Sequence, residues 1–259
     1  MPVVIVIPAR LGSWRFPNKP LTPIHSMPML EHVYRRSLLA SGVDEVVIAV
    51  CDEALADAAR SWGAKVIMTA PDCPSACDRV AQAAESMGLI HADDVVMNIQ
   101  GDEPAVPPPV IEMTAEVLRR SGLGCANLVE PILNDSELSN PHRIKAVLSR
   151  SERLLYLTRQ GIPAAVFDVK RRSRPLRQTC VFAFRGDALQ SFSRLERSSL
   201  ELIEGIDLLR LIENDVPVAS GVTSFSTYPV DTPDDVPIAE KALESDKWLS
   251  SYHDKIERT

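Results

Sequence analysis

The N-terminal part of the chain alternates short apolar runs with amphipathic stretches, and this alternation is the feature that most limits the possible folds. Apolar runs at residues 3–7, 45–50 and 65–68 have the length of buried strands. Residues 29–41 and 52–63 carry apolar residues at helical spacing, and their ends fall near Gly42 and Gly63. This strand–helix order predicts an α/β fold with a parallel sheet, right-handed crossovers and flanking helices.

The loop after the first strand has the composition of an anion-binding loop. Pro8 ends the strand, and the residues that follow supply cations and small side chains: Arg10, Gly12, Ser13, Arg15 and Lys19. Open α/β sheets bind ligands beyond the carboxyl ends of their strands, and backbone N–H groups in such loops approach phosphate oxygens closely. The loop therefore predicts a polyphosphate site. A solvated basic loop is the alternative, because no G-x-x-x-x-G-K-[ST] or G-x-G-x-x-G pattern is present.

Charge and cysteine content exclude some classes of protein. With 28 basic and 35 acidic residues among 259, the net charge of −7 argues against a nucleic-acid partner held by bulk charge. The odd number of cysteines, five, without paired CxxC motifs, favours reduced thiols and a cytoplasmic location. We expect no membrane insertion, because no signal peptide and no apolar run of membrane-spanning length is seen.

A second strand end carries acidic residues. The apolar strand at 94–100 runs into Gly101, Asp102 and Glu103. Magnesium prefers hard oxygen ligands, and one or two carboxylates together with phosphates are its usual set. Asp102 is therefore the first candidate for a metal ligand, with Glu103 orienting the loop. Turn chemistry is the alternative reading for an Asp at such a position.

These strings resemble the CMP-sugar synthetases, above all 3-deoxy-manno-octulosonate (Kdo) cytidylyltransferase. Residues 7–21 resemble the family's IPAR-x-x-S-x-R-x-P-x-KPL, and residues 98–104 resemble N-x-Q-G-D-E-P. The resemblance covers nearly the whole chain. It implies a Rossmann-like nucleotidyltransferase domain of the nucleotide-diphospho-sugar transferase type over residues 1–259, with a mixed, mostly parallel sheet. It also implies an acceptor-binding and dimerisation subregion at 150–215, because family members are usually homodimers.

The resemblance also implies roles for single residues. The string from Val230 to Asp235 is similar to the family's G-V-D-T-P-E-D-L, which makes Asp231 a second magnesium ligand; helix capping is the alternative. Residues 68–79 correspond to the segment with which the family reads the cytosine base. Here this chain departs from the family's pattern at four positions: Ala70, Cys73, Ala76 and Cys77. The implied nucleotide-binding residues are Pro8, Ala9, Arg10, Leu11, Gly12, Ser13, Arg15, Lys19, Thr69, Ser75, Asp78, Arg79 and Gln100.

The acceptor motifs diverge further. Where the family has H-x-G-I-Y-x-Y, this chain has Gln178, Phe182 and Phe184 in place of the His and both tyrosines, and so loses hydroxyl groups that would hold a polyol. Residues 200–214 predict one long helix, and the resemblance implies that this helix faces the acceptor. The implied acceptor-binding residues are Arg159, Gln178, Phe182, Glu204 and Asp207. For Arg159, a structural ion pair is an equal alternative to a contact with the acceptor. For the charged residues of the helix, a solvated helix face is a competing alternative.

Together the motifs predict a cytidylyltransferase that works with Mg²⁺. CTP and an acidic acceptor would give a CMP-conjugate and pyrophosphate, with Arg10, Lys19, Asp102 and Asp231 as catalytic residues. Kdo is the expected acceptor, which places the enzyme in lipopolysaccharide biosynthesis. A modified ulosonic acid, a small phosphonate and a non-catalytic nucleotide-binding homologue remain alternatives. A dinucleotide oxidoreductase is disfavoured, because the first turn lacks its glycines.

Overall fold

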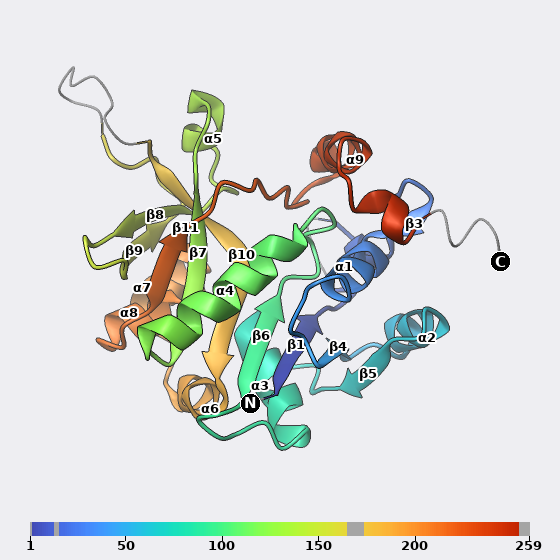
Figure 1. Ribbon diagram of the computed structural model, residues 1–259, viewed down its shortest axis with the longest axis horizontal. Coiled ribbons are helices and arrows are strands. Elements are labelled where there is room, and N and C mark those ends of the chain that lie inside the picture. The colour runs from blue at the N-terminus through green and yellow to red at the C-terminus, as the bar shows by residue number, and fades with distance from the viewer. Residues whose placement is uncertain (1, 13–15, 165–173, 254–259) are drawn as a thin grey trace.

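The computed structural model describes residues 2–12, 16–164 and 174–253, and it is built on a nine-stranded mixed sheet. Strands β11-β7-β10-β6-β1-β4-β5 follow one another across it, and β8 joins β10 to β9 (Figure 1). The strands are β1 Val3–Pro8, β4 Glu45–Val50, β5 Lys65–Met68, β6 Val95–Ile99, β7 Cys125–Pro131, β8 Lys145–Leu148, β9 Leu154–Thr158, β10 Leu176–Arg185 and β11 Ala219–Val222. A small hairpin pairs β2 Pro23–Ile24 with β3 Met27–Pro28.

The expected parallel arrangement is confirmed in the N-terminal half of the sheet. Strand β1 lies between β4 and β6 and pairs with both in parallel, and β4 continues to β5 in parallel. Within the described part of the seven-strand path, β10 is the one reversed strand, because it pairs antiparallel with β6 and β7 while β11 runs parallel to β7. The sheet is therefore mixed and mostly parallel, as expected.

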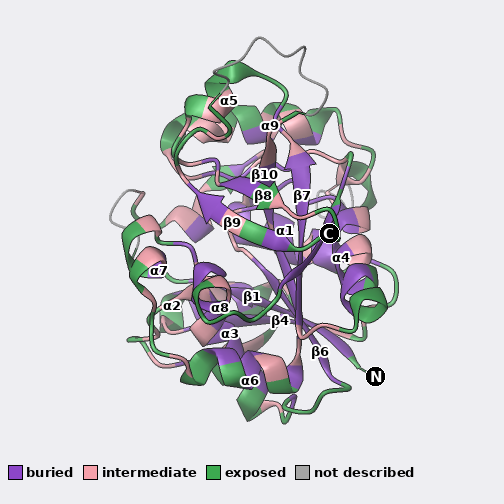
Figure 2. Ribbon diagram, turned by 90° about the vertical axis from the view of Figure 1, so that its left-hand side faces the viewer, coloured by how far each residue is buried: buried purple, intermediate pink, exposed green. Residues whose placement is uncertain are grey.

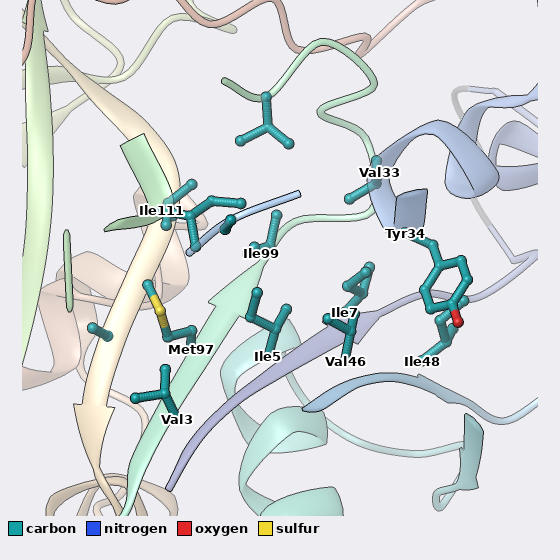
Figure 3. Close-up of a cluster of buried hydrophobic side chains, with 14 of the residues drawn as sticks. Val3, Ile5, Ile7, Val33, Tyr34, Val46, Ile48, Met97, Ile99 and Ile111 are labelled. Atoms are coloured by element: carbon teal, nitrogen blue, oxygen red, sulfur yellow. The ribbon is translucent and has the colours of Figure 1, made fainter. Parts of the chain in front are cut away.

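Helices cover both faces of the sheet, because successive side chains of a strand point to opposite faces. Val3, Ile5 and Ile7 of β1 pack in one buried cluster with α1, α2 and α4 (Figure 3). Val4 and Val6 pack in a second cluster with α3 and α6. The central strands of the sheet are buried, whereas the outer faces of the helices are exposed (Figure 2). The α-helices are α1 Met29–Ser37, α2 Glu53–Ser61, α3 Ala76–Ser86, α4 Pro108–Ser121, α5 Asp135–Ser139, α6 Gly186–Arg194, α7 Ser199–Glu204, α8 Leu209–Glu213 and α9 Val236–Glu244.

The prediction of one long helix at residues 200–214 is wrong. The structure has two short helices, α7 and α8, and Gly205 between them has a left-handed φ of 63°. A glycine in this conformation ends a helix, because it adopts positive φ without the steric cost of a Cβ atom. The last strand of the chain, β11, is limited to Ala219–Val222.

The carboxyl ends of β1 and β6 approach each other closely. A Cβ atom on Gly101 would lie 3.0 Å from the carbonyl oxygen of Pro8 and 3.1 Å from Leu30 Cδ1, so the two strand ends have room for a glycine there. The loop after β1 is held by Asp52, whose Oδ2 accepts a hydrogen bond of 2.9 Å from the backbone N–H of Leu11. No described helix has the length and hydrophobicity that crossing a membrane requires.

Candidate active site

A cavity of about 280 Å³ opens at the carboxyl ends of β1 and β6, and we call it the first cavity. Its walls come from the loop after β1, from the start of α3 and from the turn after β6. It is lined by Pro8, Ala9, Arg10, Gly12, Lys19, Pro20, Cys73, Ser75, Ala76, Arg79, Gln100, Gly101 and Asp102. This is the position at which open α/β sheets bind their ligands.

Lys19 and Asp102 form an ion pair across the first cavity. The Lys19 Nζ atom lies 2.7 Å from Asp102 Oδ2, and the two side chains are 12% and 26% exposed. Lys19 begins a short 3₁₀ turn, Lys19–Leu21, after Asn18, which has a left-handed φ of 56°. The other carboxylate oxygen, Asp102 Oδ1, is buried without a hydrogen-bond partner among the described residues. A buried acceptor atom of this kind needs a ligand, a water or an ion.

Asp231 lies in the segment next to Asp102, although the two residues are far apart in the sequence. The backbone N–H of Val230 donates a hydrogen bond of 3.0 Å to the Asp102 carbonyl oxygen. The capping of the following 3₁₀ turn, Pro233–Asp235, is carried by Thr232 and Asp235. The Asp231 carboxylate, whose Oδ2 is 4.0 Å from Arg143 Nη1, instead lines a cavity together with Asp102.

A buried carboxyl group, Glu103, and a half-buried thiol, Cys180, lie near these two aspartates. Glu103 is fully buried, and its pKa is raised to about 8, first by loss of solvation and then by the charge of Asp102. Burial also raises the pKa of the Cys180 thiol, and the negative charges of Glu103, Asp102 and Asp231 raise it further.

The first turn of α3 is tied down by side chains that the sequence predicted to bind nucleotide. Ser75 caps the helix, with its Oγ accepting from the backbone N–H of Asp78 at 3.2 Å. The Asp78 carboxylate receives two hydrogen bonds of 2.9 Å from Arg210. Arg79 is buried and donates to Thr69 Oγ1 and to the Ala70 carbonyl oxygen. Ser75 and Arg79 line the first cavity, whereas Asp78 and Thr69 support it from behind.

A second cavity of about 390 Å³ adjoins the first. The two share Arg10, Ser75, Ala76, Gln100 and Asp102. The remaining lining residues of the second cavity are Pro74, His142, Ile144, Arg159, Gln178, Cys180, Phe182, Arg197, Gly205, Ile206, Asp207, Leu208, Pro229 and Asp231. This shared wall, which includes Asp102, places the two cavities side by side.

Strand β10 forms one wall of the second cavity. Gln178, Cys180 and Phe182 line it because alternate residues of a strand share a face. The strand has an irregularity between Gln178 and Phe182, where its register against β7 shifts. The side chain of Gln178 is buried, and its Nε2 has no hydrogen-bond partner among the described residues. A buried amide donor on a cavity wall is a candidate ligand contact.

Arg159 lines the second cavity with its guanidinium held by backbone carbonyl groups. Its Nε, Nη1 and Nη2 atoms donate to the carbonyl oxygens of Glu204, Pro141 and Gly205 at 2.6, 2.9 and 3.4 Å. Glu204 does not line the cavity; its carboxylate accepts from Thr158 Oγ1 and from the Arg159 backbone N–H. Glu204 is therefore a support for Arg159.

A buried lysine holds the same segment. Lys145 is fully buried, and its Nζ donates to the carbonyl oxygens of Asn140, Arg143 and Arg159 at 2.8, 2.7 and 2.6 Å. Burial lowers the pKa of Lys145 below its ordinary value. One ammonium thus fixes the backbone beside Arg143, which faces Asp231, and beside Arg159.

Asp207 connects the second cavity to α3. Its Oδ2 accepts a hydrogen bond of 3.0 Å from the backbone N–H of Cys77, in the first turn of that helix. Burial raises the pKa of Asp207, and the hydrogen bonds from Cys77 oppose the shift.

Most of the sequence-predicted site residues line one of the two cavities. Those lining the first are Pro8, Ala9, Arg10, Gly12, Lys19, Ser75, Arg79, Gln100 and Asp102, and those lining the second include Arg159, Gln178, Phe182, Asp207 and Asp231. Leu11, Thr69, Asp78 and Glu204 lie behind the walls, and Ser13 and Arg15 lie outside the described residues. Sequence reasoning missed Arg197 and His142, because neither stands at a position that a motif specifies.

Comparisons with known proteins bear on what the two cavities bind. Residues 4–218 match the family model described as Cytidylyltransferase. A protein from Shewanella sediminis, named 8-amino-3,8-dideoxy-manno-octulosonate cytidylyltransferase, is 36% identical over 249 residues, which cover 95% of this chain and 100% of that protein. A protein of the same name from Shewanella oneidensis has the same identity and coverage.

Solved structures agree with the sequence comparisons. The structure of CMP:2-keto-3-deoxy-manno-octonic acid synthetase complexed with CTP superposes with a TM-score of 0.84 at 33% identity, covering 94% of this chain and 99% of that one. A cytidylyltransferase from Leptospira borgpetersenii, at 15% identity and a TM-score of 0.61, shares the fold over 94% of this chain and 87% of its own.

Proposed function

This chain belongs to the cytidylyltransferase family, and from that premise we propose that it transfers CMP from CTP to a Kdo-type ulosonic acid, with release of pyrophosphate. The names of the relatives support the acceptor class, since they specify an octulosonate or an octonic acid. The observation that carries the proposal is the pair of adjoining cavities, which share a wall at Asp102. One cavity has the cations for a triphosphate, and the other has the polar groups for a sugar acid.

The triphosphate would lie in the first cavity. Lys19 and Arg10 line this cavity and supply positive charge, and Gly12 leaves the backbone of the loop accessible. The nucleoside would extend toward the start of α3, where Arg79 and Ser75 lie. Pyrophosphate would leave beside Lys19, which neutralises its developing charge.

We propose that Asp102 and Asp231 hold Mg²⁺. These residues fit a hard divalent cation, because Asp102 Oδ1 is a buried oxygen without a described partner and Asp231 lines the same cavity. Among the described residues, no group of three or more His, Cys, Asp or Glu side chains could hold a metal ion, so the remaining ligands would come from the phosphates. When bound, magnesium would lower the pKa of the acceptor hydroxyl and neutralise phosphate charge.

The residues of the two cavities would align the reactants for in-line transfer. The acceptor hydroxyl oxygen forms a bond to the α-phosphorus, the bond from that phosphorus to the bridging oxygen of pyrophosphate breaks, and the hydroxyl proton passes to solvent. Arg10 lies on the wall common to both cavities, where it would stabilise the charge on the α-phosphate. Positioning and charge stabilisation supply the rate enhancement in such a reaction.

The acceptor would be bound by the second cavity. Gln178 Nε2 is a neutral buried donor on its wall, Phe182 gives an apolar surface, and Asp207 adds a carboxylate. A carboxylate there would suit an amino-substituted ulosonic acid as well as Kdo. The amino compound named in the relatives therefore belongs in any acceptor panel.

We further propose a cytoplasmic homodimer that acts in lipopolysaccharide biosynthesis. All five cysteines are free, which fits a reducing compartment. Leu155 on β9 and Leu202 and Ile203 on α7 are 54%, 58% and 79% exposed, and such side chains suit a subunit interface. The concentration dependence of sedimentation would test the dimer.

The test of the proposed function is pyrophosphate release with CTP, Mg²⁺ and a panel of acids. The panel holds Kdo, its 8-amino-8-deoxy analogue and a small phosphonate, with ATP, GTP and UTP as alternative nucleotides. We expect turnover with CTP and at least one ulosonic acid. Absence of turnover with every acid would reject the proposed catalytic function. Calorimetry with CTP and Mg²⁺, on the natural chain and on Asp102→Ala, would then show whether it is a nucleotide-binding homologue.

A further inference from the structure

The second cavity is lined by three arginines, and they differ in how many of their N–H groups are already used. Arg10 lies on the wall shared with the first cavity. Arg159 has Nε, Nη1 and Nη2 each bound to a backbone carbonyl oxygen. These three bonds hold the guanidinium against the protein's own backbone and leave two of its five N–H groups for a ligand.

Arg197 is held at one atom and leaves the rest of its guanidinium for a ligand. Its Nε donates a hydrogen bond of 2.9 Å to Glu201 Oε1, and its side chain is 36% exposed. Among the described residues, none accepts a hydrogen bond from its Nη1 or Nη2. Two adjacent NH₂ groups on a cavity wall present a planar set of donors that matches a carboxylate or two neighbouring hydroxyl oxygens.

A buried chain of ion pairs fixes the position of Arg197. Its partner Glu201 is fully buried and also receives hydrogen bonds of 2.8 and 2.7 Å from Arg210. Arg210 in turn donates twice to Asp78, which bonds to Ser75 on the wall shared by both cavities. These ion pairs restrain the Arg197 side chain at Nε. A ligand that binds the Nη groups therefore removes less conformational entropy from that side chain.

We propose that Arg197 is a specificity-determining residue, whose free Nη groups bind oxygen atoms of the acceptor. This inference rests on the proposed function, because it assigns the second cavity to the acceptor. The oxygens are those of a carboxylate or of neighbouring hydroxyl groups, which the guanidinium recognises in the same way. Arg197 thereby has the role that the sequence motif suggested for Arg159.

The test compares Arg197→Gln with Arg194→Gln, an exposed arginine at the end of α6 that lines neither cavity. At saturating CTP we expect the acceptor KM of Arg197→Gln to rise about tenfold to a hundredfold, the effect of losing a hydrogen bond to a charged group. The KM for CTP should stay within about twofold of the natural value, as should every constant of Arg194→Gln. An unchanged acceptor KM in Arg197→Gln would overturn the inference.

Two further measurements separate binding from a structural role. Glu201 keeps Arg210 as a partner in the variant, so we expect the melting temperature of Arg197→Gln to remain near the natural one. Arg197→Lys preserves a charge for Glu201 but has no planar fork, so it should also show the raised acceptor KM. If Arg197→Lys binds acceptor normally, the residue serves only to neutralise Glu201 and the inference is wrong.

Binding of the sugar acid, compared with binding of its neutral C1 carboxamide, identifies which acceptor oxygens Arg197 contacts. If Arg197→Gln weakens binding of the acid alone, Arg197 contacts the carboxylate. If it weakens binding of both compounds equally, Arg197 contacts the hydroxyl groups. Either result supports the inference. If the natural enzyme releases no pyrophosphate with any acid, the proposed function fails. If it is active and Arg197→Gln is unaffected, only this inference fails.

Discussion

The Lys19 ammonium lies 2.7 Å from Asp102 Oδ2 and joins the loop after β1 to the end of β6. This pair spans the first cavity, where we place the triphosphate. It holds the carboxylate in position while leaving Asp102 Oδ1 buried without a described partner. In the function that we propose, the cation would serve the phosphates and the anion a metal ion, the two kinds of group that nucleotidyl transfer needs at its centre.

We expect Asp102→Asn to reduce kcat/KM by about a hundredfold or more, the size of effect seen when one transition-state-stabilising group is removed. The amide removes the charge that would hold Mg²⁺ and breaks the ion pair with Lys19. Pyrophosphate release over a range of Mg²⁺ concentrations measures the loss. Asp93→Asn, in an exposed turn, is the matched control and should behave as the natural chain does. Full activity in Asp102→Asn would remove this residue from the chemistry.

Gln178→His should add a pH dependence to acceptor binding. The natural amide is a neutral donor at every pH, whereas a histidine has an ordinary pKa near 6.5 and becomes a charged donor below it. Because the group lies on the wall of the second cavity, we expect the acceptor KM of the variant to fall several-fold, relative to the natural enzyme, between pH 8 and pH 6. KM ratios across that range provide the measurement, and a ratio that does not change would show that Gln178 makes no contact with the acceptor.

His32 should make the protein less stable as the pH falls. It is fully buried; its Nε2 donates to the Ile24 carbonyl oxygen and its Nδ1 accepts from Tyr252, so the neutral ring satisfies both partners. Burial lowers its pKa from 6.5 to about 4. The unfolded chain therefore binds the proton first, and stability is lost as the pH falls from 6.5 toward 4, by at most about 3 kcal/mol.

Urea unfolding at pH 7 and pH 4.5 measures this slope. The contribution of His32 appears as the part of the difference that disappears in His32→Asn, with His91→Asn, an exposed histidine, as the control. If the natural protein and both variants lose the same free energy of unfolding between pH 7 and pH 4.5, the loss comes from groups other than His32.

Lys145→Met should destabilise the fold by about 3 kcal/mol or more, because it leaves three carbonyl oxygens without their shared donor in a buried place. The acceptor KM should rise as well, since the backbone of Arg159 loses its anchor. Denaturant unfolding gives the first quantity and pyrophosphate release the second. Lys65→Met, at an exposed pair with Glu45, should change stability by less than about 1 kcal/mol. Comparable losses in both variants would mean that the buried ammonium has no special role.

Local patterns in the sequence were sufficient for the strands and helices around the first cavity. Val3 to Ile7 is a continuous apolar run, and the structure buries it on both faces because helices cover both sides of the sheet. The same reasoning overlooked Gly205. The stripe of Leu and Ile continues across this residue, but its left-handed φ ends α7 and starts a separate turn.

The sequence by itself determined the family, the order of the N-terminal strands and helices, and the loop with its cations, since all of these depend on residues close together in the chain. The family resemblance implied that Asp231 and Asp102 would meet, and the structure brings their segments together. Only the tertiary structure decided that the Lys145 ammonium is buried against the Arg159 carbonyl oxygen, and that Arg197 lines the cavity with an open guanidinium. The reason is physical. Strand pairing, helix packing and buried ion pairs bring together residues that are distant along the chain, and no local pattern encodes which of them will meet.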